Sequence, residues 1–230
     1  HLAIWTSHRD RLATRLSALT GFPVLDGYAP GGRTEARGVR LAGGAFLDLH
    51  QHDREAPGEV FLGLRGSVDA AERLAADQGW GVRVGRWREA SDGSPWSMLT
   101  FRRGHGVLNR LFVIEYALEP EAWASPVFNQ PLYRSELAPP AGAALRRVWL
   151  AAADMAAAGA ALEALGFTAA GEIASPFPPG TGRRYRGAAG DLVLSPGDAD
   201  EVVRFDIDAP GPAEAEPFGE RLTLVTGETP

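Results

Sequence analysis

The pattern that most constrains this chain is a helix-like segment that ends at a glycine followed by an aromatic residue, and it occurs three times. The three pairs are Gly21-Phe22, Gly79-Trp80 and Gly166-Phe167. A short apolar run with the character of a strand precedes each segment, and a stretch long enough for three more strands follows it. Self-similarity at intervals of this size indicates duplication, so the sequence predicts tandem β-α-β-β-β modules.

The spacing of apolar residues supports this reading. They recur at helical intervals in each segment, at Leu12, Leu16 and Leu19, then Val68, Ala71 and Ala75, then Met155, Ala158, Leu162 and Leu165. The interval from the terminating glycine to the centre of the last expected strand is 27 residues in the first module, from Gly21 to Asp48, and 27 in the third, from Gly166 to Val193. Equal intervals favour true repetition.

The ratio of helices to strands predicts the fold class. A doubly wound parallel sheet needs a helix for nearly every strand, and here there is one for every three or four. Two architectures remain possible, a ferredoxin-like unit and a curled sheet of paired modules. The long stretch between each helix and the last strand of its module favours the curled sheet. We therefore expect an α+β protein with curled mixed sheets, three modules and a degenerate fourth.

The modules suggest a division of the chain. Residues 1–118 are expected to form the first two modules as a pair, and residues 145–230 the third module. Two further strands are expected at 202–207 and 222–225, joined by a Pro-rich connection over 209–220. The intervening stretch 119–144 is rich in proline and alanine, which is typical of a linker or of a loop packed over a surface.

Composition excludes several functions. The net charge of −6 leaves no basic stripe for a nucleic-acid partner. The absence of cysteine excludes disulfides, thiolate metal ligands and a cysteine nucleophile. No long apolar run or leader-like segment occurs, so we expect a cytoplasmic monomer or homodimer with no membrane partner. The chain begins at His1 rather than a methionine, so we expect the natural start to lie further upstream.

One run carries a family resemblance. Residues 43–49, Gly-Gly-Ala-Phe-Leu-Asp-Leu, resemble the last-strand signature of the vicinal oxygen chelate (VOC) superfamily, in which a glycine turn leads to an aromatic, an aliphatic and an acidic residue. Residues 111–116 are similar at the end of the second module. This superfamily includes glyoxalase I, bleomycin-resistance proteins and extradiol dioxygenases, and the module arrangement is most similar to bacterial glyoxalase-like proteins of unknown function. The resemblance implies an open cup that holds a ligand and, in many members, a divalent metal.

The resemblance also implies a set of metal ligands. Metal-using members take them from the first and last strands of two paired modules, with His or Gln on the first strand and Glu on the last. Carried over by position, these are His1, Asp48 and Glu115, with Zn, Fe, Mn or Ni as the ion. The fourth position falls on Val60 or Phe61, neither of which can bind a metal, so three protein ligands would have to suffice.

Glu115 is the expected catalytic residue of this set. Alternation places it on the strand face of Val113 and Ala117, which we expect to line the cup. A carboxylate in an enclosed cup is costly unless it is paired, protonated or bound to a cation. One interpretation is an ion pair with a neighbouring arginine such as Arg40, Arg65 or Arg88. The other is a metal ligand or general base.

Further candidate site residues are aromatic or imidazole side chains. Asp48, His50 and His52 alternate onto one strand face, where His50 would contact a substrate or extend into solvent. Tryptophans at 5, 87 and 96 lie on or beside expected strands. We expect Trp5, Trp87, Trp96 and His50 to contact a flat, hydrophobic substrate, with core packing as the alternative for the tryptophans.

Two functions remain open at this point. The first is a protein that binds a small molecule, aromatic or carrying vicinal oxygens, in the cup without an assigned activity. The alternative is a divalent-metal-dependent lyase, isomerase or dioxygenase in which His1, Asp48 and Glu115 hold an ion that polarises adjacent oxygens. The missing fourth ligand favours the first function, and the acidic residues expected to face the cup favour the second. No phosphate-binding loop, nucleophile elbow or His-Glu-x-x-His helix occurs.

Overall fold

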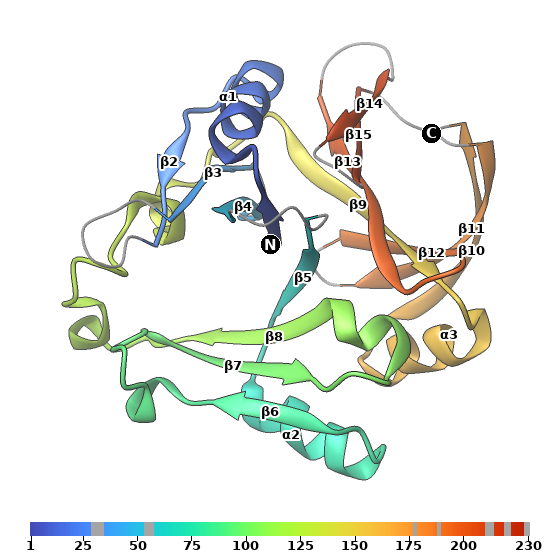
Figure 1. Ribbon diagram of the computed structural model, residues 1–230, viewed down its shortest axis with the longest axis horizontal. Helices are drawn as coiled ribbons and strands as arrows, with labels where there is room; N and C mark the ends of the chain where they lie inside the picture. The colour runs from blue at the N-terminus through green and yellow to red at the C-terminus, as the bar shows by residue number, and fades with distance from the viewer. Residues whose placement is uncertain are drawn as a thin grey trace.

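The computed structural model describes residues 1–28, 35–52, 58–176, 179–187, 190–209, 214–218 and 222–227. These residues form two curled mixed sheets, one of eight strands and one of seven, with three α-helices (Figure 1). None of the described helices is long and apolar enough to cross a membrane. The expected α+β class with curled sheets is confirmed.

The eight-stranded sheet, sheet 1, contains the first two modules. Its strands are β1 (Leu2–Thr6), β2 (Leu25–Asp26), β3 (Ala36–Arg40), β4 (Phe46–Gln51), β5 (Val60–Arg65), β6 (Val82–Gly85), β7 (Trp96–Phe101) and β8 (Leu111–Tyr116). The order across the sheet is β2-β3-β4-β1-β5-β8-β7-β6. In each module the first strand is parallel to the last, and the modules meet where β1 pairs antiparallel with β5. The module expected from the repeats is therefore present twice in one sheet.

The seven-stranded sheet, sheet 2, repeats this plan incompletely. Its strands are β9 (Ala144–Ala152), β10 (Thr168–Pro176), β11 (Pro179–Gly187), β12 (Gly190–Pro196), β13 (Glu201–Asp208), β14 (Glu214–Phe218) and β15 (Leu222–Thr226). The order is β10-β11-β12-β9-β13-β15-β14, with β9 antiparallel to β13 and β13 parallel to β15. The last three strands occupy the place of a fourth module, and no helix lies among their described residues. The degenerate fourth module is confirmed.

One strand of this module was not expected. We expected a Pro-rich connection over 209–220, but its described part contains β14, which pairs with β15 at the edge of sheet 2. Pro217 interrupts the apolar pattern there. Proline is tolerated in an edge strand because one side of that strand has no neighbouring strand that needs a hydrogen bond from its N–H. The expectation of a strandless connection was wrong for this reason.

The three helices are α1 (Arg9–Thr20), α2 (Val68–Asp77) and α3 (Met155–Ala164). The glycines after them, Gly21, Gly79 and Gly166, have φ values of +73°, +69° and +90°. This left-handed conformation is strained for a residue with a Cβ, so glycine is the residue that can end each helix there. The aromatic residue that follows packs against the core in each module.

One face of each sheet packs against the helices in a shared core. This helix-side core includes Leu12 and Leu16 of α1, Val68 of α2 and Leu162 of α3, together with side chains from both sheets. On sheet 1 the opposite face has its own cluster, formed by Ala3, Phe112 and Ile114 with aromatic neighbours. That opposite face is hereafter the cup face.

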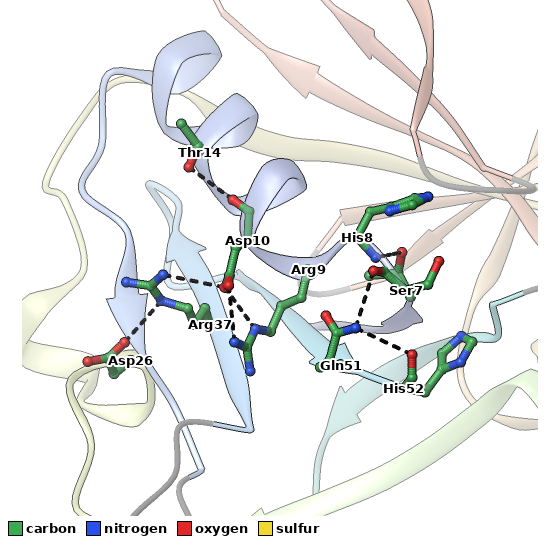
Figure 2. Close-up of polar contacts among 10 residues, drawn as sticks. Ser7, His8, Arg9, Asp10, Thr14, Asp26, Arg37, Gln51 and His52 are labelled. Carbon is green, nitrogen blue, oxygen red and sulfur yellow. Dashed lines mark hydrogen bonds and ion pairs between the residues drawn. The ribbon is translucent and has the colours of Figure 1, made fainter. Parts of the chain in front are cut away.

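Polar contacts fix the outer part of the first module (Figure 2). Arg37 of β3 donates to Asp10 of α1 at 3.4 Å and to Asp26 of β2 at 3.2 Å, and Arg9 also donates to Asp10. Gln51 donates to the Ser7 carbonyl at 3.2 Å. Exposed ion pairs contribute about 0–1 kcal/mol each, so these contacts orient the helix more than they stabilise it.

Candidate functional site

Strand alternation determines which side chains reach the cup face. On β4, Leu47 and Leu49 belong to the helix-side core, so Phe46, Asp48 and His50 point to the opposite side. On β8, Leu111 and Val113 belong to the helix-side core, and the cluster of the cup face contains Phe112 and Ile114 with Tyr116 packed against it. Both last strands therefore present an aromatic residue first, followed by Asp48 in one module and Ile114 in the other.

Glu115 lies on the helix side and not in the cup, which corrects its expected orientation. Its Oε2 accepts a hydrogen bond of 2.7 Å from the Val68 N–H at the start of α2. A carboxylate is favourable there because the first N–H groups of a helix are unsatisfied and carry partial positive charge. Alternation correctly grouped Glu115 with Val113, but it does not specify which face of a strand curls inward.

The implied metal does not fit the ligand set taken from the resemblance. Glu115 is on the opposite face from Asp48, and Ile114, at the corresponding cup position, has no donor atom. Within the described ranges, no group of three or more histidine, aspartate or glutamate side chains is placed to hold an ion. His1, Asp48 and Glu115 are thus not brought together.

His1 is a wall residue of the cup. Its backbone nitrogen donates to the Gly63 carbonyl at 2.9 Å, and the Gly63 N–H donates to the His1 carbonyl at 2.7 Å, which continues the ladder of β1 and β5. The imidazole stacks on Phe46 at 4.4 Å between ring centroids and meets the edge of Phe112 at 5.1 Å. The ring is thus packed between aromatic residues of both modules.

Asp48 and His50 form a pair on the cup face of β4. His50 Nε2 lies 3.1 Å from Asp48 Oδ2, and the His50 ring stacks on Trp5 at 4.4 Å. Asp48 is only 5% exposed, and its Oδ1 has no hydrogen-bond partner among the described residues. Burial lowers the pKa of His50, but the charge and hydrogen bond of Asp48 outweigh it, so the pKa lies above its usual value.

Residues 119–143, the cover segment, pack over the cup face. The segment contains short 3₁₀ helices at Pro120–Trp123, Pro131–Tyr133 and Ser135–Leu137, and it lies beside β2 and β3 in Figure 1, in yellow-green. The Tyr133 hydroxyl accepts from the Tyr28 N–H at 3.0 Å and donates to Asp48 Oδ2 at 3.4 Å. Of the two interpretations of this Pro-rich stretch, the loop packed over a surface describes its position.

A cavity of about 530 Å³ lies between the cover segment and the cup face. Ring side chains line it from both sides, namely His1, Phe46 and Tyr116 of sheet 1 and Trp123 and Tyr133 of the cover segment. Three cationic side chains, Arg40, Arg65 and Arg134, also line it, together with Glu136. Apolar walls with a few convergent charged groups are typical of sites for small molecules.

The four residues that we expected to contact a substrate lie outside the lining of this cavity. Trp96 packs behind its wall, with ring centroids 6.3 Å from Tyr116 and 5.6 Å from Tyr133. His50 and Trp5 lie beyond Asp48, and Trp87 lines a separate cavity of about 480 Å³ near Glu115. None of the four is among the described lining residues of the larger cavity.

Sequence reasoning missed the cover segment as a source of site residues. Trp123, Phe128 and Tyr133 are aromatic, and a solvated linker has little reason to contain three large aromatic residues. Phe128 is 1% exposed and packs at 5.0 Å from both Tyr28 and Trp96. The aromatic content of the Pro-rich stretch was therefore the available signal.

The corresponding face of sheet 2 holds a buried ion pair. Arg204 binds Asp206 through two hydrogen bonds, 2.5 Å from Nε to Oδ1 and 3.0 Å from Nη2 to Oδ2. Trp149 Nε1 donates to Asp206 Oδ2 at 3.1 Å, and the Arg204 guanidinium lies 4.5 Å from the centre of the Trp149 ring. Arg204 and Asp206 are 2% and 1% exposed. Arg147, which is 4% exposed, also lies 3.8 Å from Asp206 Oδ2, so two buried arginines share this carboxylate.

No family model matches the sequence, and no curated protein matches it. Solved structures do match the fold over 98% of the chain. A hypothetical protein from Staphylococcus aureus has a TM-score of 0.66 at 9% identity, over 96% of its own length. An extradiol ring-cleaving dioxygenase from B. fuscum has a TM-score of 0.65 at 12% identity, over 70% of its own length. A Mn(II)-bound glyoxalase from Novosphingobium aromaticivorans has a TM-score of 0.60 at 12% identity, over 80% of its own length. Likeness at such low identity concerns the fold.

Proposed function

The chain has the fold of the vicinal oxygen chelate superfamily, and from this premise we propose that it binds a small molecule between the cup face of sheet 1 and the cover segment. The cavity of about 530 Å³ at this place is the observation that carries the proposal. A fold does not specify a function, so the argument depends on the side chains of the cavity.

The lining favours a flat ligand with an aromatic part. Phe46 and Tyr116 lie on the sheet side, and Trp123 and Tyr133 lie on the cover side. A ring between them would gain area burial and stacking contacts of about 0.5–1.5 kcal/mol each. A cavity of this volume is within the usual range for small ligands.

Binding through side chains is favoured over the metal-dependent alternative because the expected ligand set is divided between two faces. Glu115 is occupied at the start of α2, and Ile114 takes its place in the cup. The cavity walls offer rings and guanidinium groups instead, which recognise a ligand directly.

A test fills the cavity from the cover side. Ser135 is exposed and lines the cavity, so Ser135→Trp places an indole in the proposed ligand volume. Ser91→Trp, at an exposed turn outside the cavity, is the matched control. Binding of single-ring aromatic compounds is measured by saturation-transfer NMR on the wild-type protein and both variants.

We expect the wild-type protein and Ser91→Trp to bind the same compounds and Ser135→Trp to lose them. Circular dichroism verifies that Ser135→Trp is folded. Retention of all binding by a folded Ser135→Trp variant would place the ligand elsewhere, and the absence of any bound aromatic compound in the wild-type protein would contradict the proposal.

A further inference from the structure

Arg40 is the most unusual charged residue of the cavity. It belongs to β3, where it pairs with Phe46 of β4, and its side chain lies on the cavity wall with only 4% of the residue exposed. The guanidinium lies 5.2 Å from the centre of the Phe46 ring. Arginine is almost never this deeply buried unless it is paired with an acidic group.

Within the described part of the chain, Arg40 has no acidic partner. Its Nη1 donates to the Leu132 carbonyl at 2.6 Å and its Nη2 donates to the Gly44 carbonyl at 3.3 Å. Its Nε is buried without any partner. An arginine side chain has five N–H donors, so the Nε–H and one N–H on each terminal nitrogen remain uncommitted.

Arg204 shows how this chain satisfies a buried arginine elsewhere. It is buried to a similar degree in sheet 2, but Asp206 accepts two of its hydrogen bonds and neutralises its charge. The two arginines lie on different strands, Arg40 on β3 and Arg204 on β13, and they differ in that Arg40 has no carboxylate partner among the described residues. Burial also lowers the pKa of Arg40, and the negative charge of Glu136 opposes this effect only in part.

The surroundings do not supply the missing anion. Glu136 lies in an ion pair with Arg134 at 2.5 Å, and Arg65, also on the wall, has no ion pair among the described residues. Asp48 is in contact with His50 and Tyr133 and does not belong to the cavity lining. The wall around Arg40 therefore has an excess of positive charge.

We propose that the ligand of the cup carries a carboxylate that binds the uncommitted N–H groups of Arg40, with its aromatic part between the rings of the cavity. The planar guanidinium matches a carboxylate in two parallel hydrogen bonds, which are shorter and stronger than neutral ones. This inference rests on the proposed function and adds the chemical class of the ligand, an aromatic carboxylate.

The test compares acids with neutral molecules of the same shape. Calorimetric titration measures the affinities of benzoate and phenylacetate and of the corresponding amides, benzamide and phenylacetamide. We expect the acids to bind about tenfold or more tightly than the amides, the ratio that one charge-assisted pair supplies. In Arg40→Gln this preference is expected to disappear while the amides still bind, which verifies that the cover segment is in place.

Arg37→Gln is the matched control because Arg37 lies on the same strand with its side chain on the helix side. It removes one positive charge without touching the cavity, and the preference for acids should remain. The wild-type protein supplies a second measurement. Since Arg40 is buried, the preference should change little with added salt, whereas a preference produced by exposed cations would be screened.

The outcomes separate the two proposals. If amides and acids bind with equal affinity, or if a folded Arg40→Gln keeps the preference, the carboxylate inference is wrong and the binding function stands. If salt abolishes the preference, Arg40 is not its source. If no acid or amide binds the wild-type protein at millimolar concentration, the proposed function fails and this inference fails with it.

Discussion

The charge of His50 depends on Asp48, and this dependence gives a pH effect on stability. The pKa of His50 is raised in the folded protein, so protonation favours folding. That contribution is fully present below the pKa of an unfolded histidine, about 6.5, and is lost as the pH rises through the folded pKa. The free energy of unfolding should therefore fall across this window for the wild-type protein.

Asp48→Asn is predicted to lower the pKa of His50 and to weaken this pH dependence. The Asn side chain keeps a similar shape but removes the charge that outweighs burial. NMR titration of the His50 ring and urea unfolding at several pH values measure both effects. Asp26→Asn, which removes an exposed carboxylate on β2 that is paired with Arg37, should leave the His50 titration unchanged. An unshifted His50 in Asp48→Asn would contradict the pairing.

Individual residues also mark the limit of sequence reasoning. Alternation grouped Asp48 with His50 and Glu115 with Val113, as the structure has them. It could not specify which group faces the cup, because each last strand has apolar side chains on both faces. Arg40 could not be singled out either, since its isolation from carboxylates results from contacts with Leu132, which is distant in sequence.

At the scale of elements, Glu115 links β8 to the start of α2. Glu115→Gln keeps an oxygen that can accept from the Val68 N–H but removes the charge, and we expect a loss of about 0.3–1 kcal/mol in the free energy of unfolding. Glu115→Ala also removes the acceptor at the start of α2, and we expect a total loss of about 0.5–2 kcal/mol. Urea unfolding measures both.

The same variants distinguish this structural role from the role expected from the family resemblance. Affinity for aromatic compounds and metal content by elemental analysis should be equal in wild-type protein and Glu115→Gln. Loss of a stoichiometric metal from the variant alone would restore Glu115 as a ligand.

The elements themselves were the most predictable part of the structure. The helices were evident because terminating glycines and apolar intervals are local signals. The cover segment and β14 were not evident, since their conformations depend on the surface or strand that each packs against. Tyr133, for example, is positioned by Tyr28 and Asp48, about a hundred residues away in sequence.

At the scale of the whole molecule, the two sheets share one core but fill their cups differently. Duplication was readable in the sequence because each module repeats its helix terminator. The side-chain contacts on the cup face of each sheet could not be predicted from the sequence. A sequence does not distinguish Arg204, which is paired with Asp206, from Arg40, which has no acidic partner among the described residues. Among the described residues, the cup face of sheet 1 borders a cavity, and the corresponding face of sheet 2 holds a buried ion pair.

This difference leads to a prediction for the entire protein. Asp206→Asn leaves Arg204 buried without a counter-charge, so we expect a loss of about 3–5 kcal/mol in the free energy of unfolding. Asp208→Asn, two residues further along β13 and half exposed beside Arg146, should cost only about 0–1 kcal/mol. The helix-side core includes side chains of both sheets, and Arg110 donates to the Asp200 carbonyl at 2.9 Å. The loss of stability should therefore affect both sheets together. Urea unfolding followed by the NMR signals of the backbone amides of Leu49 in sheet 1 and Leu194 in sheet 2 should give coincident transitions that shift together in Asp206→Asn. A transition of sheet 2 that shifts while that of sheet 1 remains would mean that the core is divided into two independent units.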